Sequence, residues 1–337
     1  MRNLVSAAFL LALGLLLAAE AGVRLFLPHG VSGRFSYGYD LQAGFVEQGN
    51  GQVKLVRAGG RRFYPQTFSY QRPPDCWRIL VIGDSVPRGP NLTASYAGRL
   101  QEELSLRNIR SEVINMAIPG YGARRCQLVL RQGLKYEPNL IILHLNDSNE
   151  FEDEREYRRS LEFRGWHVKH WPMKVFIFAR AYEIKTEKIL WRLIPEKIRL
   201  QSAVNDADAE VRASQDQQQQ RLWGDRVREV TKATVEMARN RDVPLILVTQ
   251  GTIAQNNGAT WNIDDGGLDE LARSLVGPGV YLLSMKQVFS RLTGIQSYFS
   301  DGAHLTRKGH EVMAQALADL ISSRLAEQVA LQGRAGR

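Results

Sequence analysis

Short, uninterrupted apolar runs recur along the chain and alternate with stretches of helical periodicity. A continuous apolar run of four to six residues is typical of a strand covered on both faces. Strands that alternate with helices predict a three-layer α/β/α fold with a mostly parallel central sheet. The expected strands are Ile79–Ile82, Glu112–Met116, Leu140–Leu143, Val243–Val248 and Val280–Leu283, and the expected helices cover 95–106, 125–134 and 308–326.

The first 28 residues have a different pattern. No charged residue occurs between Arg2 and Glu20, and Leu and Ala dominate the stretch between them. A core helix would usually keep a polar face, which this stretch lacks. The length suits a short transmembrane helix, but Ala19, Glu20 and Ala21 also fit a small-x-small signal cleavage site. Anchor and cleaved signal both remain open, and both export the rest of the chain.

The remaining chain divides into a connector, a main domain and a tail. Residues 29–75 form the connector, in which Val53–Val56 and Arg62–Tyr64 flank a glycine turn and predict a hairpin. The main domain spans 76–328, with a helical insertion at about 151–240, and 329–337 form the tail. Two interpretations of the insertion remain open: a lid or acceptor platform over the site, or helices packed at the sheet edge or the membrane surface.

Charge and cysteine content narrow the class of protein. The net charge is +9, but 35 acidic residues are interspersed with 44 basic ones. Without a recognition helix, zinc-finger spacing or a clustered basic arm, nucleic acid is not an expected partner. The two cysteines, Cys76 and Cys126, are too few for a disulfide framework and are expected to be separately buried thiols.

Polar residues suited to acyl transfer follow the predicted strands. Ser85 comes directly after the first strand, and a serine hydroxyl becomes an effective nucleophile when a base removes its proton. His304 is the expected base, since histidine titrates near neutrality. Asp301 lies three residues earlier, so one loop would deliver the base and the carboxylate that orients it. These three residues predict a catalytic triad.

Four sequence blocks resemble the SGNH hydrolase superfamily, the GDSL esterases and lipases. Gly83-Asp84-Ser85 matches the first block, Gly120 the second, Asn146 the third, and Asp301 with His304 the last. The resemblance implies an oxyanion hole made by the Ser85 N–H, the Gly120 N–H and the Asn146 side chain, and it implies neither a cofactor nor a metal. One position departs from the family: His144 stands where the third block usually has glycine, and we interpret it as a packed core histidine.

Acidic residues cluster directly after the third block. Glu150, Glu152, Asp153, Glu154 and Glu156 fall within seven residues. Carboxylates favour the first turn of a helix, because backbone N–H groups are unsatisfied there. We therefore expect a solvated helix start, not a cation site.

The leading hypothesis is a serine esterase that acts on an acyl ester, either an O-acetylated cell-envelope glycan or a lipid. A glycan O-acetyltransferase would use the same triad with a sugar hydroxyl as acceptor. A third hypothesis is a non-catalytic envelope glycan-binding or assembly protein on this fold. The resemblance to membrane-anchored bacterial members places the domain on the periplasmic face of the inner membrane, or makes it a secreted protein if the N-terminal segment is cleaved.

Overall fold

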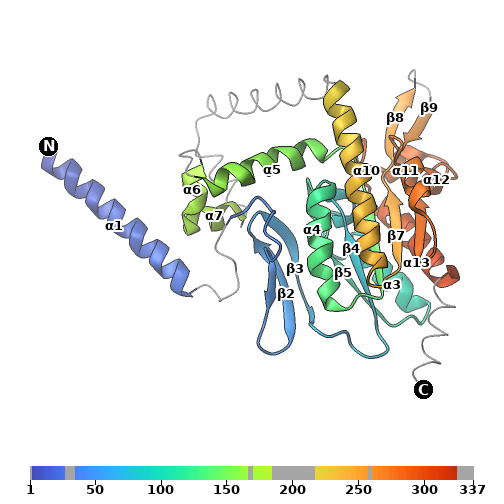
Figure 1. The fold of residues 1–337 in the computed structure, drawn as a ribbon, viewed down its shortest axis with the longest axis horizontal. Helices are drawn as coiled ribbons and strands as arrows, with labels where there is room; N and C mark the ends of the chain where they lie inside the picture. Colours follow the sequence, from blue (N-terminus) through green and yellow to red (C-terminus); the bar gives the residue numbers. More distant parts are fainter. Residues whose placement is uncertain (1, 27–34, 166–169, 184–216, 257–259, 325–337) are drawn as a thin grey trace. The chain divides into compact units, whose positions relative to one another are not determined.

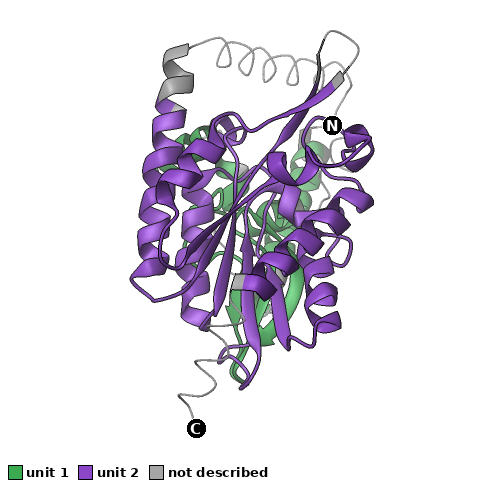
Figure 2. Ribbon diagram, turned by 90° about the vertical axis from the view of Figure 1, so that its right-hand side faces the viewer, with its two compact units in different colours: residues 1–68, 154–215 green, residues 69–153, 216–337 purple. Residues whose placement is uncertain are grey.

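The computed structural model describes residues 2–26, 35–165, 170–183, 217–256 and 260–324. The chain divides into two compact units, coloured separately in Figure 2. One unit contains Met1–Phe68 and Glu154–Gln215, and the other contains Ser69–Asp153 and Asp216–Arg337. All four sequence blocks lie in the second unit.

The second unit is organised around a five-stranded parallel sheet. Its strand order is β10-β7-β6-β4-β5, and every neighbouring pair is parallel. Each strand overlaps one of the apolar runs, which confirms the predicted fold class. The strands are β4 (Trp77–Ile82), β5 (Ser111–Asn115), β6 (Leu140–Leu145), β7 (Leu245–Thr249) and β10 (Val280–Ser284).

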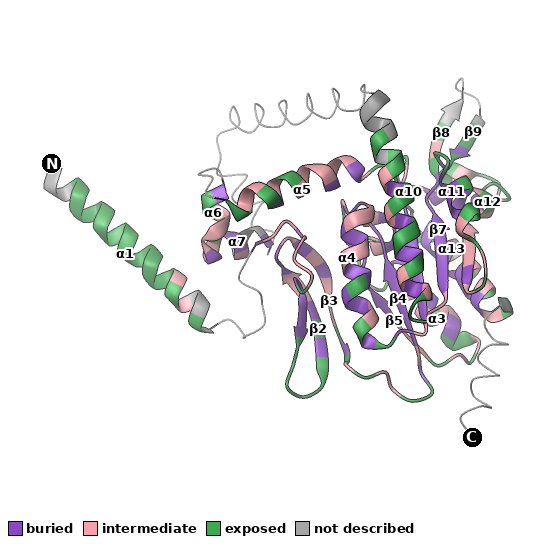
Figure 3. Ribbon diagram, in the orientation of Figure 1, coloured by how far each residue is buried: buried purple, intermediate pink, exposed green. Residues whose placement is uncertain are grey.

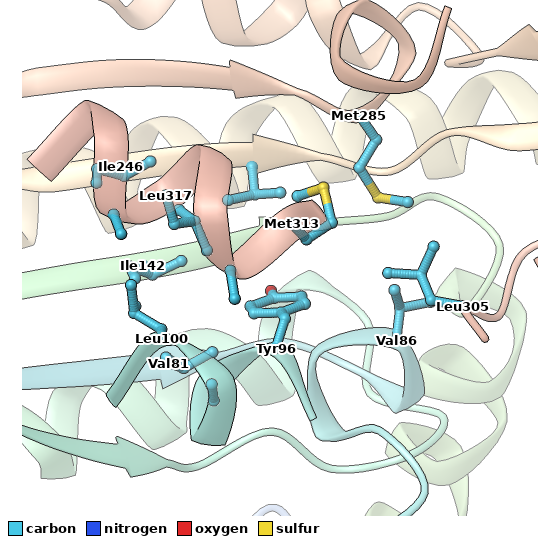
Figure 4. Close-up of a cluster of buried hydrophobic side chains, with 14 of the residues drawn as sticks. Val81, Val86, Tyr96, Leu100, Ile142, Ile246, Met285, Leu305, Met313 and Leu317 are labelled. Carbon is cyan, nitrogen blue, oxygen red and sulfur yellow. The ribbon is translucent and has the colours of Figure 1, made fainter. Parts of the chain in front are cut away.

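Helices cover both faces of this sheet (Figure 1). On one face, α3 (Tyr96–Leu106) and α13 (Arg307–Arg324) pack over alternate strand residues such as Val81, Ile142 and Ile246 (Figure 4). The opposite face carries α4 (Ala123–Gly133) and α10 (Gln217–Arg239). Smaller elements complete the unit: α2 (Ser85–Arg88), η1 (Leu134–Tyr136), α11 (Leu268–Leu275), α12 (Met285–Phe289) and η3 (Ile295–Tyr298).

Register brings the loops of the first three blocks to one edge of the sheet. Ile82 of β4 lies opposite Leu143 of β6, and Val81 lies opposite Asn115 of β5. The residues that follow these strands therefore emerge at the same level. The backbone N–H of Ile118 donates to the Gly83 carbonyl at 2.9 Å, which joins the first and second loops directly.

An antiparallel hairpin was not predicted from the sequence. It consists of β8 (Thr252–Asn256) and β9 (Thr260–Asp264). Ile253 is the one large apolar residue of β8, and β9 has only Trp261 and Ile263, so neither strand forms an apolar run like those of the central sheet. The hairpin also supports the loop of the last block, because the Ile253 N–H donates to the Gly302 carbonyl at 2.8 Å.

The first unit contains the predicted hairpin in a three-stranded sheet of order β1-β2-β3. Its elements are α1 (Arg2–Phe26), β1 (Phe45–Glu47), β2 (Gln52–Ala58), β3 (Arg61–Ser69), α6 (Trp171–Lys174) and α7 (Phe176–Glu183). Helix α5 (Glu150–Arg164) begins in the second unit and continues in the first. The described parts of the predicted insertion are helical.

Helix α1 differs from the other helices in its exposure (Figure 3). Its apolar stretch Val5–Gly22 is long enough to cross a membrane, and none of it is buried. A signal sequence has the same length and hydropathy, so the fold is compatible with both a membrane anchor and a cleaved signal. Both cysteines are free and buried, which confirms the prediction made for them.

Candidate active site

Ser85 is held at the start of α2 by a tight turn. Gly83 has φ +159°, and a Cβ added there would lie 2.7 Å from both His144 Cβ and Pro87 Cγ, so only glycine fits. Asp84 caps the helix, and its Oδ1 accepts the Val86 N–H at 2.9 Å. The Ser85 N–H is one of the donors that a helix start leaves without an intrahelical partner. This N–H can therefore serve as a hydrogen-bond donor to an oxyanion.

The three residues predicted as a triad lie in hydrogen-bond contact. His304 Nδ1 lies 2.8 Å from Asp301 Oδ2, and His304 Nε2 lies 2.8 Å from Ser85 Oγ. A carboxylate only accepts, so Nδ1 carries the proton and Nε2 accepts from the serine hydroxyl. This arrangement is the one in which histidine can take the serine proton during attack. The structure thus brings together residues separated by 219 positions in the chain.

Asp301 is fixed by its own loop. Its Oδ1 accepts the backbone N–H groups of Ala303 at 2.8 Å and His304 at 2.7 Å. Burial raises the pKa of Asp301, but these two N–H groups and the His304 ring outweigh it, and the net effect is a lowered pKa. The carboxylate therefore stays ionised and can stabilise a protonated histidine.

Asn146 follows β6, and its amide orientation is set by a neighbour. The Asn149 N–H donates to Asn146 Oδ1 at 3.2 Å, which identifies the oxygen and directs the amide nitrogen away from it. That nitrogen lies 3.4 Å from the Tyr121 carbonyl. Since an amide nitrogen carries two hydrogens, a second one is available for an oxyanion. Asn146 is only 5% exposed, so this orientation is maintained by packing.

Asn149 also joins the third block to the first. Its Nδ2 donates to Asp84 Oδ2 at 2.8 Å. Asp84 is 2% exposed, and burial raises its pKa to about 6, against the lowering effects of the Val86 N–H, His304 and Asn149. The two carboxylate oxygens of Asp84 therefore link the residue that follows Ser85 to Asn149, just after the third block.

Gly120 lies in a turn of Ile118, Pro119, Gly120 and Tyr121. The Tyr121 N–H donates to the Ile118 carbonyl at 3.3 Å, and Gly120 has φ +72°. Proline second and glycine with positive φ third are the residues of a type II turn. Substitution of Gly120 would also drive a side chain into the Glu152 carboxylate.

The acidic cluster differs from its prediction. A helix does start there, as expected, but Glu150 and Asp153 are fully buried instead of solvated. Glu150 Oε1 accepts the Ala123 N–H at the start of α4 at 2.6 Å. Asp153 pairs with Arg125, which is itself 5% exposed. The reason is packing: Gly122 has no side chain, which lets both acids approach the second block closely.

His144 is a packed, hydrogen-bonded core residue, as interpreted from the sequence. It is 1% exposed, and its Nδ1 lies 3.1 Å from the Tyr96 hydroxyl. Burial lowers its pKa to about 3, so the ring is neutral. Its Cβ lies behind Gly83, and in that position it supports the turn that carries Ser85.

Arg125, Asn149 and Asp153 were not identified from the sequence as residues of this site. In the sequence, Arg125 marks only the start of a predicted helix. Asp153 lies within an acidic run typical of a solvated helix start, and Asn149 directly precedes that run. No group of three or more His, Cys, Asp or Glu side chains in the described part of the chain could hold a metal ion.

No protein-family model matches the chain, and no curated protein matches it in sequence. Among solved structures, the acetyl xylan esterase AlAXEase matches with a TM-score of 0.46 at 14% identity over 72% of this chain and 99% of its own. The lipase/acylhydrolase from Enterococcus faecalis gives 0.44 at 11% identity over 74% and 96%. A lipolytic protein of the G-D-S-L family from Desulfitobacterium hafniense gives 0.38 at 12% identity over 72% and 98%. Each of these three chains is matched over nearly its whole length.

Proposed function

We propose that this chain is a serine esterase that cleaves an acyl ester through an acyl-Ser85 intermediate. The observation that carries the proposal is the pair of 2.8 Å contacts that link Ser85 Oγ, the His304 ring and Asp301. Such a chain of contacts supplies a nucleophile, its base and the group that orients the base. The four matched blocks of the SGNH resemblance agree with this assignment.

The reaction has two halves. Ser85 Oγ attacks the ester carbonyl while His304 Nε2 takes the hydroxyl proton, and the Ser85 N–H, the Gly120 N–H and the Asn146 amide stabilise the oxyanion. The C–O bond to the leaving alcohol then breaks, and His304 gives its proton to that alcohol. Water repeats the sequence on the acyl-serine: it loses a proton to His304, the acid is released, and the proton returns to Ser85 Oγ.

The direct test is hydrolysis of p-nitrophenyl acetate by the wild type and by Ser85→Ala. We expect the variant to lose at least about 10⁴-fold in kcat, because the triad acts as a unit. Ser105→Ala is the matched control, since this exposed serine lies at the C-terminal end of α3 and outside the four blocks. A fluorophosphonate probe should label the wild type and the control but not Ser85→Ala. A wild type that neither hydrolyses esters nor reacts with the probe would instead favour the non-catalytic glycan-binding alternative.

The acceptor distinguishes esterase from transferase. A sugar hydroxyl in place of water would make the same intermediate a route to glycan O-acetylation. Mass spectrometry of envelope glycans from cells with and without the protein separates the two. Extra acetyl groups in the deletion strain support hydrolysis, whereas their loss would support transfer.

We also propose that α1 remains attached as a membrane anchor, with the catalytic unit outside the cytoplasm. Glu20 supports retention: its two carboxylate oxygens accept the N–H groups of Phe176 and Ile177 at 2.9 Å each, at the start of α7. Cleavage after Ala21 would remove this cap. The mature protein should therefore keep its first residues and stay in the membrane fraction through alkaline carbonate washing. A soluble protein that begins at Gly22 would contradict the anchor.

A further inference from the structure

A buried ion pair lies behind the turn that carries Gly120. Arg125 is 5% exposed and Asp153 is fully buried. The Arg125 guanidinium donates through Nε to Asp153 Oδ1, and the Arg125 backbone N–H donates to Oδ2 at 3.3 Å. Burying two charges costs several kcal/mol per ion, and an apolar pair of similar volume often stabilises a fold as well. A contribution to fold stability is therefore a weak explanation for the presence of this buried ion pair.

The rest of the guanidinium is directed at the turn. Arg125 Nη2 donates to the Gly120 carbonyl, and the guanidinium carbon lies 4.3 Å from the centre of the Tyr121 ring. Arg125 thus contacts both of the last two residues of the turn. Asp153 in turn fixes the side chain of Arg125, because it binds both the guanidinium and the backbone of the same residue.

The geometry of the turn connects the contact between Arg125 and the Gly120 carbonyl to the position of the Gly120 N–H. Type I and type II turns differ by rotation of the central peptide, which here is the one between Pro119 and Gly120. That peptide carries the Gly120 N–H, so the rotation would reverse the direction of the donor. Gly120 has φ +72°, the type II value, which sets the direction of this N–H. Arg125 holds the next peptide of the turn through the Gly120 carbonyl and so anchors the residue that carries the donor.

We propose that Arg125 and Asp153 are positioning residues that keep the Gly120 N–H aimed at the oxyanion. The inference rests on the proposed esterase function, since it assigns these residues to the same oxyanion hole. Neither side chain touches the reacting atoms. The pair acts on Ser85 chemistry only through the backbone of Gly120.

The test uses the full-length protein and two variants. Asp153→Asn replaces the ion pair between Asp153 and Arg125 by a weaker hydrogen bond. The double variant Arg125→Met/Asp153→Asn removes both charges, so that no buried charge is left unpaired. We expect kcat for p-nitrophenyl acetate to fall about 10²-fold in each, the usual cost of one oxyanion donor, with KM little changed. Rates are expressed per Ser85 labelled by the fluorophosphonate probe, so that misfolded protein does not count.

Glu150→Gln is the matched control. Glu150 lies on the same turn of α5 and is equally buried, and the substitution is the same change of a carboxyl group to an amide. However, it accepts from the Ala123 N–H and not from a group that binds Gly120. We expect its kcat to stay within about threefold of the wild type, since its removal leaves every oxyanion donor in place.

The outcomes separate this inference from the proposed function. An active wild type, together with a double variant that keeps wild-type kcat per labelled serine, would overturn the positioning role and leave the esterase intact. Loss of kcat in Glu150→Gln equal to that in Asp153→Asn would also overturn it, because any buried charge change on α5 would then suffice. A wild type without esterase activity or probe labelling would refute the function itself.

Discussion

The two halves of the proposed active site are built in opposite ways. On the oxyanion side, Asp84, Asn146 and Asp153 are at most 5% exposed and lie within a continuous set of hydrogen bonds. On the base side, the side chains of Asp301 and His304 are 56% and 48% exposed. The difference matches the tasks, because donors to an oxyanion act by being preorganised. A base must instead exchange protons with alcohol and water.

The same difference separates activity from stability. An exposed His–Asp contact contributes little to folding, since solvent screens it. Buried hydrogen bonds contribute more, and each one that is broken leaves a polar group unpaired. Substitutions on the base side should therefore impair catalysis with the fold unaffected. On the oxyanion side the two effects should occur together.

After the loss of Ser85 itself, the largest expected effect is that of His304→Ala on the base side. Without its base, Ser85 retains its proton, and kcat for p-nitrophenyl acetate should fall about 10⁴-fold. The free energy of unfolding, measured by thermal denaturation, should change by no more than about 0.5 kcal/mol, as for an ordinary surface substitution. A large loss of stability in this variant would contradict the contrast between the two halves.

Asn146→Ala tests the oxyanion side with a smaller effect on rate. Removal of one donor should lower kcat about 10²–10³-fold. Because Asn146 is buried and accepts the Asn149 N–H, the variant should also lose on the order of 1–3 kcal/mol of stability. The two measurements are kcat per labelled serine and the free energy of unfolding from urea denaturation. Unchanged stability would mean that this side is not held as tightly as its burial indicates.

The sequence predicts the parallel sheet and the four blocks well for one physical reason. Strands buried on both faces leave apolar runs, and the predicted site residues follow them at the carboxyl edge. Ser85, Gly120, Asn146, Asp301 and His304 all occupy such positions or the adjoining last loop. The 2.8 Å contact between Ser85 and His304 is the outcome.

The support of the oxyanion side is harder to predict, because it depends on burial that a charge pattern does not reveal. Asp153 and Glu150 look like surface acids, and only the fold places them against Gly122. Hairpin β8–β9 is also hard to predict, because its two short strands have only Ile253, Trp261 and Ile263 as large apolar residues. Its contact with Gly302 is made by a backbone N–H, which any residue possesses.

Glu150→Gln sharpens the comparison through the pH dependence of stability. Burial raises the pKa of Glu150 to about 7, with Asp153 adding to the effect. Since the folded pKa exceeds the unfolded value, the folded state binds more protons between pH 4.5 and 7, and stability falls as pH rises through that window. The cost above pH 7 is on the order of 3 kcal/mol. Glu150→Gln should remove this part of the slope, measured by urea denaturation at pH 5 and pH 8. Equal slopes in the two proteins would contradict it.

The smallest expected effect is that of thiol reagents on the native enzyme. Cys126 lies on α4 of the oxyanion side, and burial, reinforced by Asp153 and Asp84, raises its pKa well above the ordinary thiol value. The reactive species is the thiolate, so iodoacetamide at pH 8 should leave Cys126 unmodified and kcat unchanged for hours. After urea unfolding, mass spectrometry should find both cysteines alkylated. Rapid labelling of Cys126 in the native protein would show that α4 opens readily beside the Gly120 turn, which would contradict the rigid oxyanion side.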